Sequence, residues 1–154
     1  MDLESVKKLL ETTTSSEGEE IYDSPGSSFD PLIIQGIKVD LIEPGRIICS
    51  MKVPPRLLNS GNSLHGGAMA SLVDIIGVAA KNTAGAKASG VSVGINISYL
   101  DYVYLDEEIE IEANVVRVGK AARVAMVELR KKKTGKIVAQ GRHTMYLAVS
   151  SKLR

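Results

Sequence analysis

The sequence predicts an α+β fold in which one buried helix is wrapped by a single antiparallel sheet of about six strands. Residues 66–81 carry apolar residues on every side, which is typical of a buried helix. A strand-like hairpin precedes this segment, and four strand-like segments follow it, with short turns between the last three. Short turns favour antiparallel neighbours, so one sheet must cover the helix.

We expect residues 1–28 to form a mobile N-terminal segment with a possible short amphipathic helix at 3–10. Residues 11–28 are polar and rich in Ser, Thr, Gly and Glu, a composition that buries little apolar surface. The folded domain is expected at 29–150. Its first two strands are predicted at 36–43 and 46–53, on either side of a Pro-Gly turn, which indicates a hairpin.

The four later strands are predicted at 91–99, 107–118, 121–132 and 137–148. The first two alternate apolar and polar residues, which is the pattern of a sheet with one solvent-exposed face. Short turns at 119–120 and 134–136 separate the last three. A single sheet of this kind leaves a long edge, so we expect two copies of the chain to pair side by side.

Composition narrows the class of protein. The chain has 154 residues, of which 44% are hydrophobic and 24% charged, as in ordinary globular proteins. Its single cysteine, Cys49, lies in an apolar run and predicts a buried thiol in a reducing compartment. No segment is long enough to span a bilayer, so we expect a cytoplasmic protein without a membrane partner. Peroxisomal import is the alternative, because a Ser-Lys-Leu signal precedes Arg154.

Charge is distributed unevenly along the chain. Of the 19 basic and 18 acidic residues, eleven basic residues and one acidic residue lie in 117–154. A basic C-terminal third favours an anionic ligand. Nucleic acid is a weaker candidate, because the net charge is only +1 and this segment contains one aromatic residue, Tyr146.

Asp74 is the most informative residue. It lies in the middle of the predicted helix and is the only charged residue between Arg56 and Lys81. An isolated carboxylate costs several kcal/mol to bury unless it is paired or protonated, and such groups often mark functional sites. The structural alternative is an aspartate that bonds a neighbouring loop or faces a polar notch.

A second candidate feature stands where this helix begins, at His65-Gly66-Gly67. The first N–H groups of a helix have no partner within it, and two glycines let a ligand oxygen approach them. They would suit an oxyanion or a carbonyl oxygen, or merely permit close helix–sheet packing. His65 could act as a base, cap the helix or, as we prefer, orient Asn59. The sequence contains no cysteine and histidine cluster that fits a metal.

Several motifs in order along the chain resemble the PaaI-type hotdog thioesterases, and most closely their acyl-CoA thioesterase branch. The resemblance covers roughly residues 36–148. Its motifs are NSGNSLHGG at 59–67, LVD at 72–74, GVSV at 90–93, NISY at 96–99 and TGKIVAQGRHT at 134–144.

The resemblance implies a hotdog fold and hydrolysis of acyl-CoA, a role in lipid metabolism, with CoA as part of the substrate and no separate cofactor. It places the catalytic carboxylate on Asp74 and a water-positioning serine on Ser92, both from one protomer. It places the carbonyl-polarising N–H on Gly66, with His65 and Asn59 beside the thioester, all from the other protomer of a homodimer or dimer-of-dimers tetramer. The implied CoA-binding residues are Tyr99, Arg117, Gly119, Lys120 and Tyr146.

Two alternatives remain open from the sequence. One is an enoyl-CoA hydratase on the same fold, which would need a histidine acting together with a carboxylate. The other is a non-catalytic acyl-CoA-binding module, although the chain keeps each polar residue that the resemblance leads us to expect. Residues 101–104 are bulkier than the small, proline-containing stretch common in the family, which affects the shape of the channel for the acyl group or pantetheine.

Overall fold

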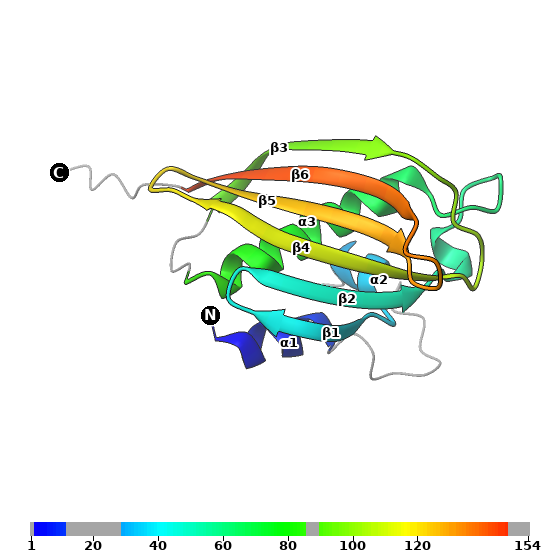
Figure 1. Cartoon of the computed structure of the whole chain (residues 1–154), viewed down its shortest axis with the longest axis horizontal. Helices are drawn as coiled ribbons and strands as arrows, with labels where there is room; N and C mark the ends of the chain where they lie inside the picture. The colour runs from blue at the N-terminus through cyan, green and yellow to red at the C-terminus, as the bar shows by residue number, and fades with distance from the viewer. Residues whose placement is uncertain (1, 12–28, 86–89, 148–154) are drawn as a thin grey trace.

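The computed structural model describes residues 2–11, 29–85 and 90–147. One six-stranded antiparallel sheet curves around a long helix, α3 (Figure 1). The strand order is β1-β2-β4-β5-β6-β3. The elements are α1 (Leu3–Glu11), α2 (Phe29–Ile34), β1 (Lys38–Glu43), β2 (Arg46–Lys52), the 3-10 turn η3 (Pro55–Leu57), α3 (Gly66–Thr83), β3 (Gly90–Tyr99), β4 (Glu108–Val118), β5 (Ala122–Lys131) and β6 (Ile137–Leu147).

The sheet separates an apolar face from a charged one, as the alternation predicts. On β4, Ile109 and Ile111 are completely buried and belong to the core that α3 covers. The intervening Glu110 and Glu112 point to the opposite face, where both pair with Arg130 of β5. Hydrogen bonds from Arg130, Arg46 and Asn114 lower the pKa of Glu112 to about 2, against the opposing effect of burial, so this carboxylate is ionised at neutral pH.

α3 packs its inner side on the sheet through residues such as Leu72 and Ile76, both completely buried. The predicted hotdog arrangement of the α+β class is confirmed. α1 and α2 also contact α3. Among the described residues, no helix combines the length and the apolar character that crossing a membrane requires.

The structure describes part of the segment 1–28, for which the sequence predicts a mobile chain with a possible short helix. α1 occupies the place of the suggested short helix, and it buries Val6 and Leu10 completely against the body of the protein. α2, which the sequence analysis did not anticipate, follows at Phe29. Residues 12–28, the polar part of that expectation, lie outside the described residues.

β3 stands at one edge of the sheet and pairs only with β6. Its alternating apolar residues are not covered: Val91 and Val93 are each 60% exposed, and Ile95 is exposed as well. A β-bulge between Ser92 and Gly94 interrupts the pairing with β6. An apolar edge strand of this kind is a ready surface for pairing with a second copy.

Candidate functional site

Asp74 lies in the middle of α3, and its side chain points toward β3 and β6. Its Oδ1 accepts a hydrogen bond from the Ser92 hydroxyl at 3.0 Å and lies 3.1 Å from Nε2 of His143. The side chain is 42% exposed, so the carboxylate is not buried as the sequence suggested. No described residue donates a hydrogen bond to Oδ2.

His143 of β6 connects this carboxylate to the interior. Its ring is completely buried, with Nε2 2.7 Å from the Ser92 hydroxyl and Nδ1 2.9 Å from Nζ of Lys81. Lys81 is on α3, two turns after Asp74, and is also completely buried. The sequence analysis did not single out His143, which reaches this site because β6 packs against α3 and brings together residues 62 positions apart.

Gly77 makes room for the imidazole. It lies on α3 between Asp74 and Lys81, and a Cβ at this position would stand 2.9 Å from Nδ1 of His143. Glycine within a helix costs about 1 kcal/mol relative to alanine. The close approach of His143 gives a physical reason for this unfavourable residue.

The electrostatics of the cluster favour a neutral imidazole and a cationic lysine at neutral pH. Burial lowers the pKa of His143, and the Lys81 cation lowers it further, while Asp74 opposes the shift. Burial also lowers the pKa of Lys81, to about 8, with Asp74 opposing and Arg123 of β5 contributing. Lys81 is therefore mostly protonated below pH 8, although it is out of contact with water.

The other predicted residues gather where α3 begins. His65 caps the helix, because its Nδ1 accepts a hydrogen bond from the Gly67 N–H at 2.8 Å. Asn59 binds its own loop through hydrogen bonds to Gly61 and Ser63. The structure thus shows His65 as a cap, and no hydrogen bond joins it to Asn59.

Gly66 is the first residue of α3, and its N–H has no acceptor among the described residues. Its carbonyl accepts a hydrogen bond from the Tyr99 hydroxyl at 2.9 Å, so the end of β3 lies over it. Eight residues of helix separate Gly66 from Asp74, a rise of about 12 Å. This distance is too long for one thioester carbonyl to contact both residues within a single chain.

The residues that the resemblance assigns to CoA are also divided. Arg117, Gly119 and Lys120 lie at the turn between β4 and β5, beside Tyr146, which pairs with Ala122. Tyr99 stands at the far end of β3, opposite Ala139. Eight residues of strand separate Tyr99 from Val91, the partner of Tyr146, which corresponds to about 26 Å.

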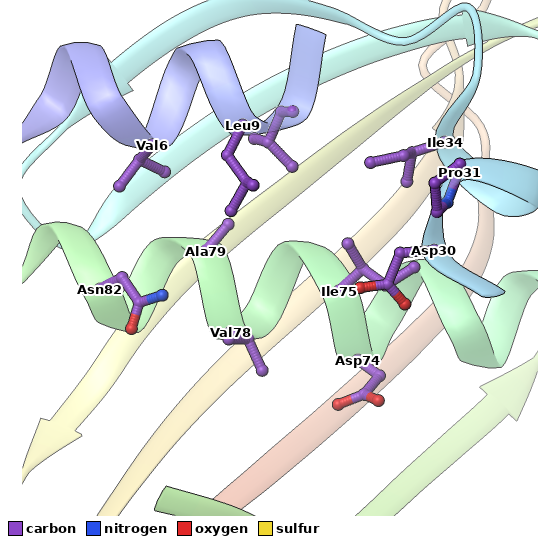
Figure 2. A pocket seen from close by; sticks show the side chains of 11 residues that line it. Val6, Leu9, Asp30, Pro31, Ile34, Asp74, Ile75, Val78, Ala79 and Asn82 are labelled. Atoms are coloured by element: carbon purple, nitrogen blue, oxygen red, sulfur yellow. The ribbon is translucent and has the colours of Figure 1, made fainter. Parts of the chain in front are cut away.

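A pocket of about 230 Å³ opens beside Asp74, between the outer side of α3 and the two N-terminal helices (Figure 2). Its walls are mainly apolar, with Asp74 at one margin and Asp30 of α2 at another. The apolar lining includes Val6, Leu9, Leu10, Pro31, Ile34, Ile75, Val78 and Ala79. This pocket was not anticipated, because it depends on how α1 and α2 fold back onto α3.

Comparisons with known proteins agree with this fold. Residues 61–138 match the family model described as the thioesterase superfamily. Acyl-coenzyme A thioesterase 13 of Homo sapiens is 44% identical over 112 residues, covering 71% of this chain and 80% of that protein. The crystal structure of zebra fish thioesterase superfamily member 2 aligns with a TM-score of 0.82 and 37% identity, over 96% of this chain and 99% of that one. A hypothetical thioesterase from Streptococcus pneumoniae, solved with coenzyme A, aligns with a TM-score of 0.68 and 25% identity, over 73% and 85% of the two chains.

Proposed function

This chain belongs to the thioesterase superfamily, and we propose that it hydrolyses acyl-CoA thioesters to a free acid and CoA, with Asp74 as the catalytic carboxylate. The observation that carries the proposal is the geometry of that side chain. Its Oδ1 accepts a hydrogen bond from Ser92 and lies 3.1 Å from His143, while the side chain is 42% exposed and lines an apolar pocket. A carboxylate that is oriented on one side and accessible on the other is suited to act on water.

In the proposed reaction, Asp74 removes a proton from a water molecule that Ser92 helps to place. The water oxygen bonds to the thioester carbon, the carbon–sulfur bond then breaks, and the CoA thiolate takes up a proton. General-base assistance of this kind contributes roughly 100- to 10,000-fold to the rate. Direct attack by the carboxylate on the carbonyl is the alternative role for Asp74.

We propose that the carbonyl is polarised by Gly66 of a second protomer, with His65 and Asn59 beside it. The distance along α3 supports this, because Gly66 of the same chain lies about 12 Å away along the helix. The exposed apolar face of β3 supports pairing of two chains into a homodimer. A dimer of dimers would be the complete assembly.

We propose that the CoA phosphates bind the basic turn between β4 and β5. Arg117 and Lys120 are both exposed there, and cations of this kind are ordinary phosphate partners. Gly119 and Tyr146 lie beside them, and Tyr99 would contact the same substrate from the other half-site. CoA is part of the substrate, so no separate cofactor is proposed.

The pocket beside Asp74 would receive the acyl group. Its lining from α1, α2 and α3 is mainly apolar, and a substrate carbonyl at Asp74 would bring the acyl chain to its margin (Figure 2). An apolar pocket with few polar groups is typical of sites for aliphatic ligands.

The buried Cys49 thiol, whose pKa burial raises to about 12, supports a reducing compartment such as the cytoplasm.

The test is Asp74→Asn, measured by thiol release from a panel of acyl-CoA substrates. We expect kcat to fall roughly 100- to 10,000-fold, with little change in CoA binding. Asp106→Asn is the matched control, because it removes an equal charge at a loop position with φ of 63°, which asparagine tolerates. Near wild-type kcat for Asp74→Asn would contradict the proposal.

One observation favours a second candidate, an enoyl-CoA hydratase. Such an enzyme uses a histidine with a carboxylate, and His143 lies 3.1 Å from Asp74. Yet His143 is completely buried, and both ring nitrogens already have partners within the protein, so it has no free nitrogen for a substrate. Incubation with crotonyl-CoA distinguishes the two: we expect free thiol, whereas hydration without thiol release would support the hydratase.

A further inference from the structure

A line of hydrogen-bonding groups runs from the interior to the proposed catalytic carboxylate. Nζ of Lys81 lies 2.9 Å from Nδ1 of His143, and Nε2 of the same ring lies 2.7 Å from the Ser92 hydroxyl and 3.1 Å from Oδ1 of Asp74. The two ring nitrogens of His143 therefore contact different residues: Nδ1 contacts Lys81, and Nε2 contacts Ser92 and Asp74.

The protonation state of Lys81 determines which ring nitrogen carries the hydrogen. A charged ammonium has three donors and no acceptor, so its contact with Nδ1 requires a lone pair on that atom. The neutral ring must then carry its hydrogen on Nε2. From there it is donated toward Ser92 and Asp74, and the Ser92 hydroxyl donates in turn to Oδ1.

This tautomer decides between two chemistries open to the same side chains. A serine hydroxyl 2.7 Å from a histidine nitrogen resembles an activated nucleophile with its base. A ring that carries hydrogen on Nε2 cannot accept the proton of Ser92. Of the three side chains Asp74, Ser92 and His143, Asp74 is then the one that can accept a proton from a substrate water, and Ser92 serves as a hydrogen-bond donor.

We propose that Lys81 is a positioning residue that holds His143 in the Nε2–H tautomer and thereby assigns the role of base to Asp74. The role of Asp74 as the base rests on the proposed function. The tautomer of His143 is independent of the proposed function, because it follows from the contact between a charged Lys81 and His143.

The cost of this arrangement supports a functional role. Lys81 is completely buried, and none of the described residues provides a carboxylate within ion-pair distance of it. A buried cation without such a partner is expensive, and a hydrophobic residue of similar volume is often neutral or stabilising in its place. Gly77 is a second locally unfavourable residue of the same helix, and it also serves His143. Two such departures converging on one ring are expected at functional sites.

The charged groups around Lys81 set the pH range in which it acts. His143 faces it from β6, Arg123 from β5 and Asp74 from its own helix. The Lys81 pKa of about 8 keeps the ammonium in place at neutral pH. Above that pH the neutral amine can also accept a hydrogen bond from Nδ1, so Lys81 no longer favours the Nε2–H tautomer of His143.

The direct experiment is ¹⁵N NMR of the histidine rings in the wild type and in Lys81→Met. The chain has only two histidines, so His143→Asn suffices to assign the signals. We expect the Nε2–H tautomer of His143 in the wild type at pH 7, and a shift toward Nδ1–H, or a mixture, in Lys81→Met. An unchanged Nε2–H tautomer in the variant would overturn the proposal.

Kinetics and stability separate positioning from a merely structural role. For Lys81→Met we expect kcat about 10- to 100-fold lower, the usual effect of losing a group that orients a site residue, with KM nearly unchanged. We expect an equal or higher Tm, because a buried charge is removed. The wild-type kcat should decline above pH 8, and this decline should be absent in the variant. A wild-type kcat in Lys81→Met would overturn the proposal.

Arg123→Met is the matched control. It removes another largely buried cation from the same neighbourhood without touching His143, and its Nε has no partner among the described residues. We expect its tautomer and its kcat to match the wild type. Equal losses in both lysine and arginine variants would assign the effect to general charge and overturn the specific role of Lys81. If wild-type hydrolysis proves independent of Asp74, the proposed function fails, whereas the NMR result still decides the role of Lys81.

Discussion

The two halves of α3 present opposite kinds of chemistry. At its beginning, Gly66 offers an N–H without an acceptor among the described residues, and His65 and Asn59 are occupied with capping and loop bonds. From the middle of the helix onward, Asp74 and Lys81 flank a buried histidine and share a connected set of polar contacts. The beginning of the helix supplies a backbone donor, and its middle supplies a carboxylate that buried polar residues contact.

This contrast motivates the proposal that two chains share each site. Donor and carboxylate lie about 12 Å apart along the axis, too far to act on one thioester within one chain. In the proposed dimer, a second chain beside β3 would bring the beginning of one helix to the middle of the other, and each pair of groups would then form one site.

After the loss expected for Asp74→Asn, the next largest effect is expected from removing the donor. Gly66→Pro deletes the N–H at the first helical position, where proline is well tolerated, and His65 already has the extended backbone (ψ 135°) that precedes proline. We expect kcat to fall roughly 100- to 1,000-fold in the thiol-release assay, as when an oxyanion donor is lost. Gly66→Ala keeps the N–H, and its Cβ would stand 3.4 Å from the Tyr99 ring, so a smaller loss is expected. Equal losses would refute the donor role.

Mixing the two half-sites tests whether they come from different chains. Asp74→Asn and Gly66→Pro are each expected to be nearly inactive, but a mixed dimer would have one site with both groups intact. Co-expression of the two variants should restore about a quarter of wild-type activity, because half of randomly formed dimers are mixed. Thiol release by the purified mixture measures this. A mixture as inactive as its parents would show that each site lies within one chain.

A smaller effect is expected from crowding His143. In Gly77→Ala the new Cβ would stand 2.9 Å from Nδ1, so the ring must shift away from Lys81 and Asp74. We expect kcat to fall about 10-fold, while alanine partly offsets the strain by favouring the helix by about 1 kcal/mol. Thermal unfolding and kcat, measured together, check this. Wild-type kcat would mean that the exact position of the ring does not matter.

Filling the pocket should change substrate preference more than overall rate. Val78→Trp adds volume to the apolar lining beside Asp74, and we expect kcat/KM for long acyl chains to fall about 10-fold relative to acetyl-CoA. Leu41→Trp on β1, a partly exposed position away from the pocket, is the control and should leave the chain-length profile unchanged. A parallel loss across all chain lengths in Val78→Trp would place the acyl group elsewhere.

The smallest effect is expected from the basic turn, because both side chains are exposed and screened by salt. Arg117→Glu and Lys120→Glu should raise KM for acyl-CoA several-fold and leave kcat nearly unchanged, since they act on binding alone. Lys133→Glu, in an exposed lysine run away from this turn, is the control. A KM equal to the wild type would remove this turn from the CoA site.

Periodicity in the sequence determined the secondary structure well. Alternation and turn residues predicted all six strands within a few residues, and the apolar run predicted α3. Two local signals likewise identified Asp74 and Gly66 as candidates. Asp74 is a single carboxylate in an apolar helical segment, and Gly66 belongs to a glycine pair at the start of that helix. These signals are local, and each depends on residues only a few positions apart.

Only the tertiary structure decided what supports Asp74. His143 and Lys81 lie 62 positions apart, and they meet because β6 crosses beneath α3, with Gly77 leaving space for the ring. The pocket likewise exists only because α1 and α2 fold back over the same helix. A lysine or histidine in a strand or helix pattern ordinarily indicates solvent exposure. Contacts between distant segments reversed that expectation, and no local pattern carries this information.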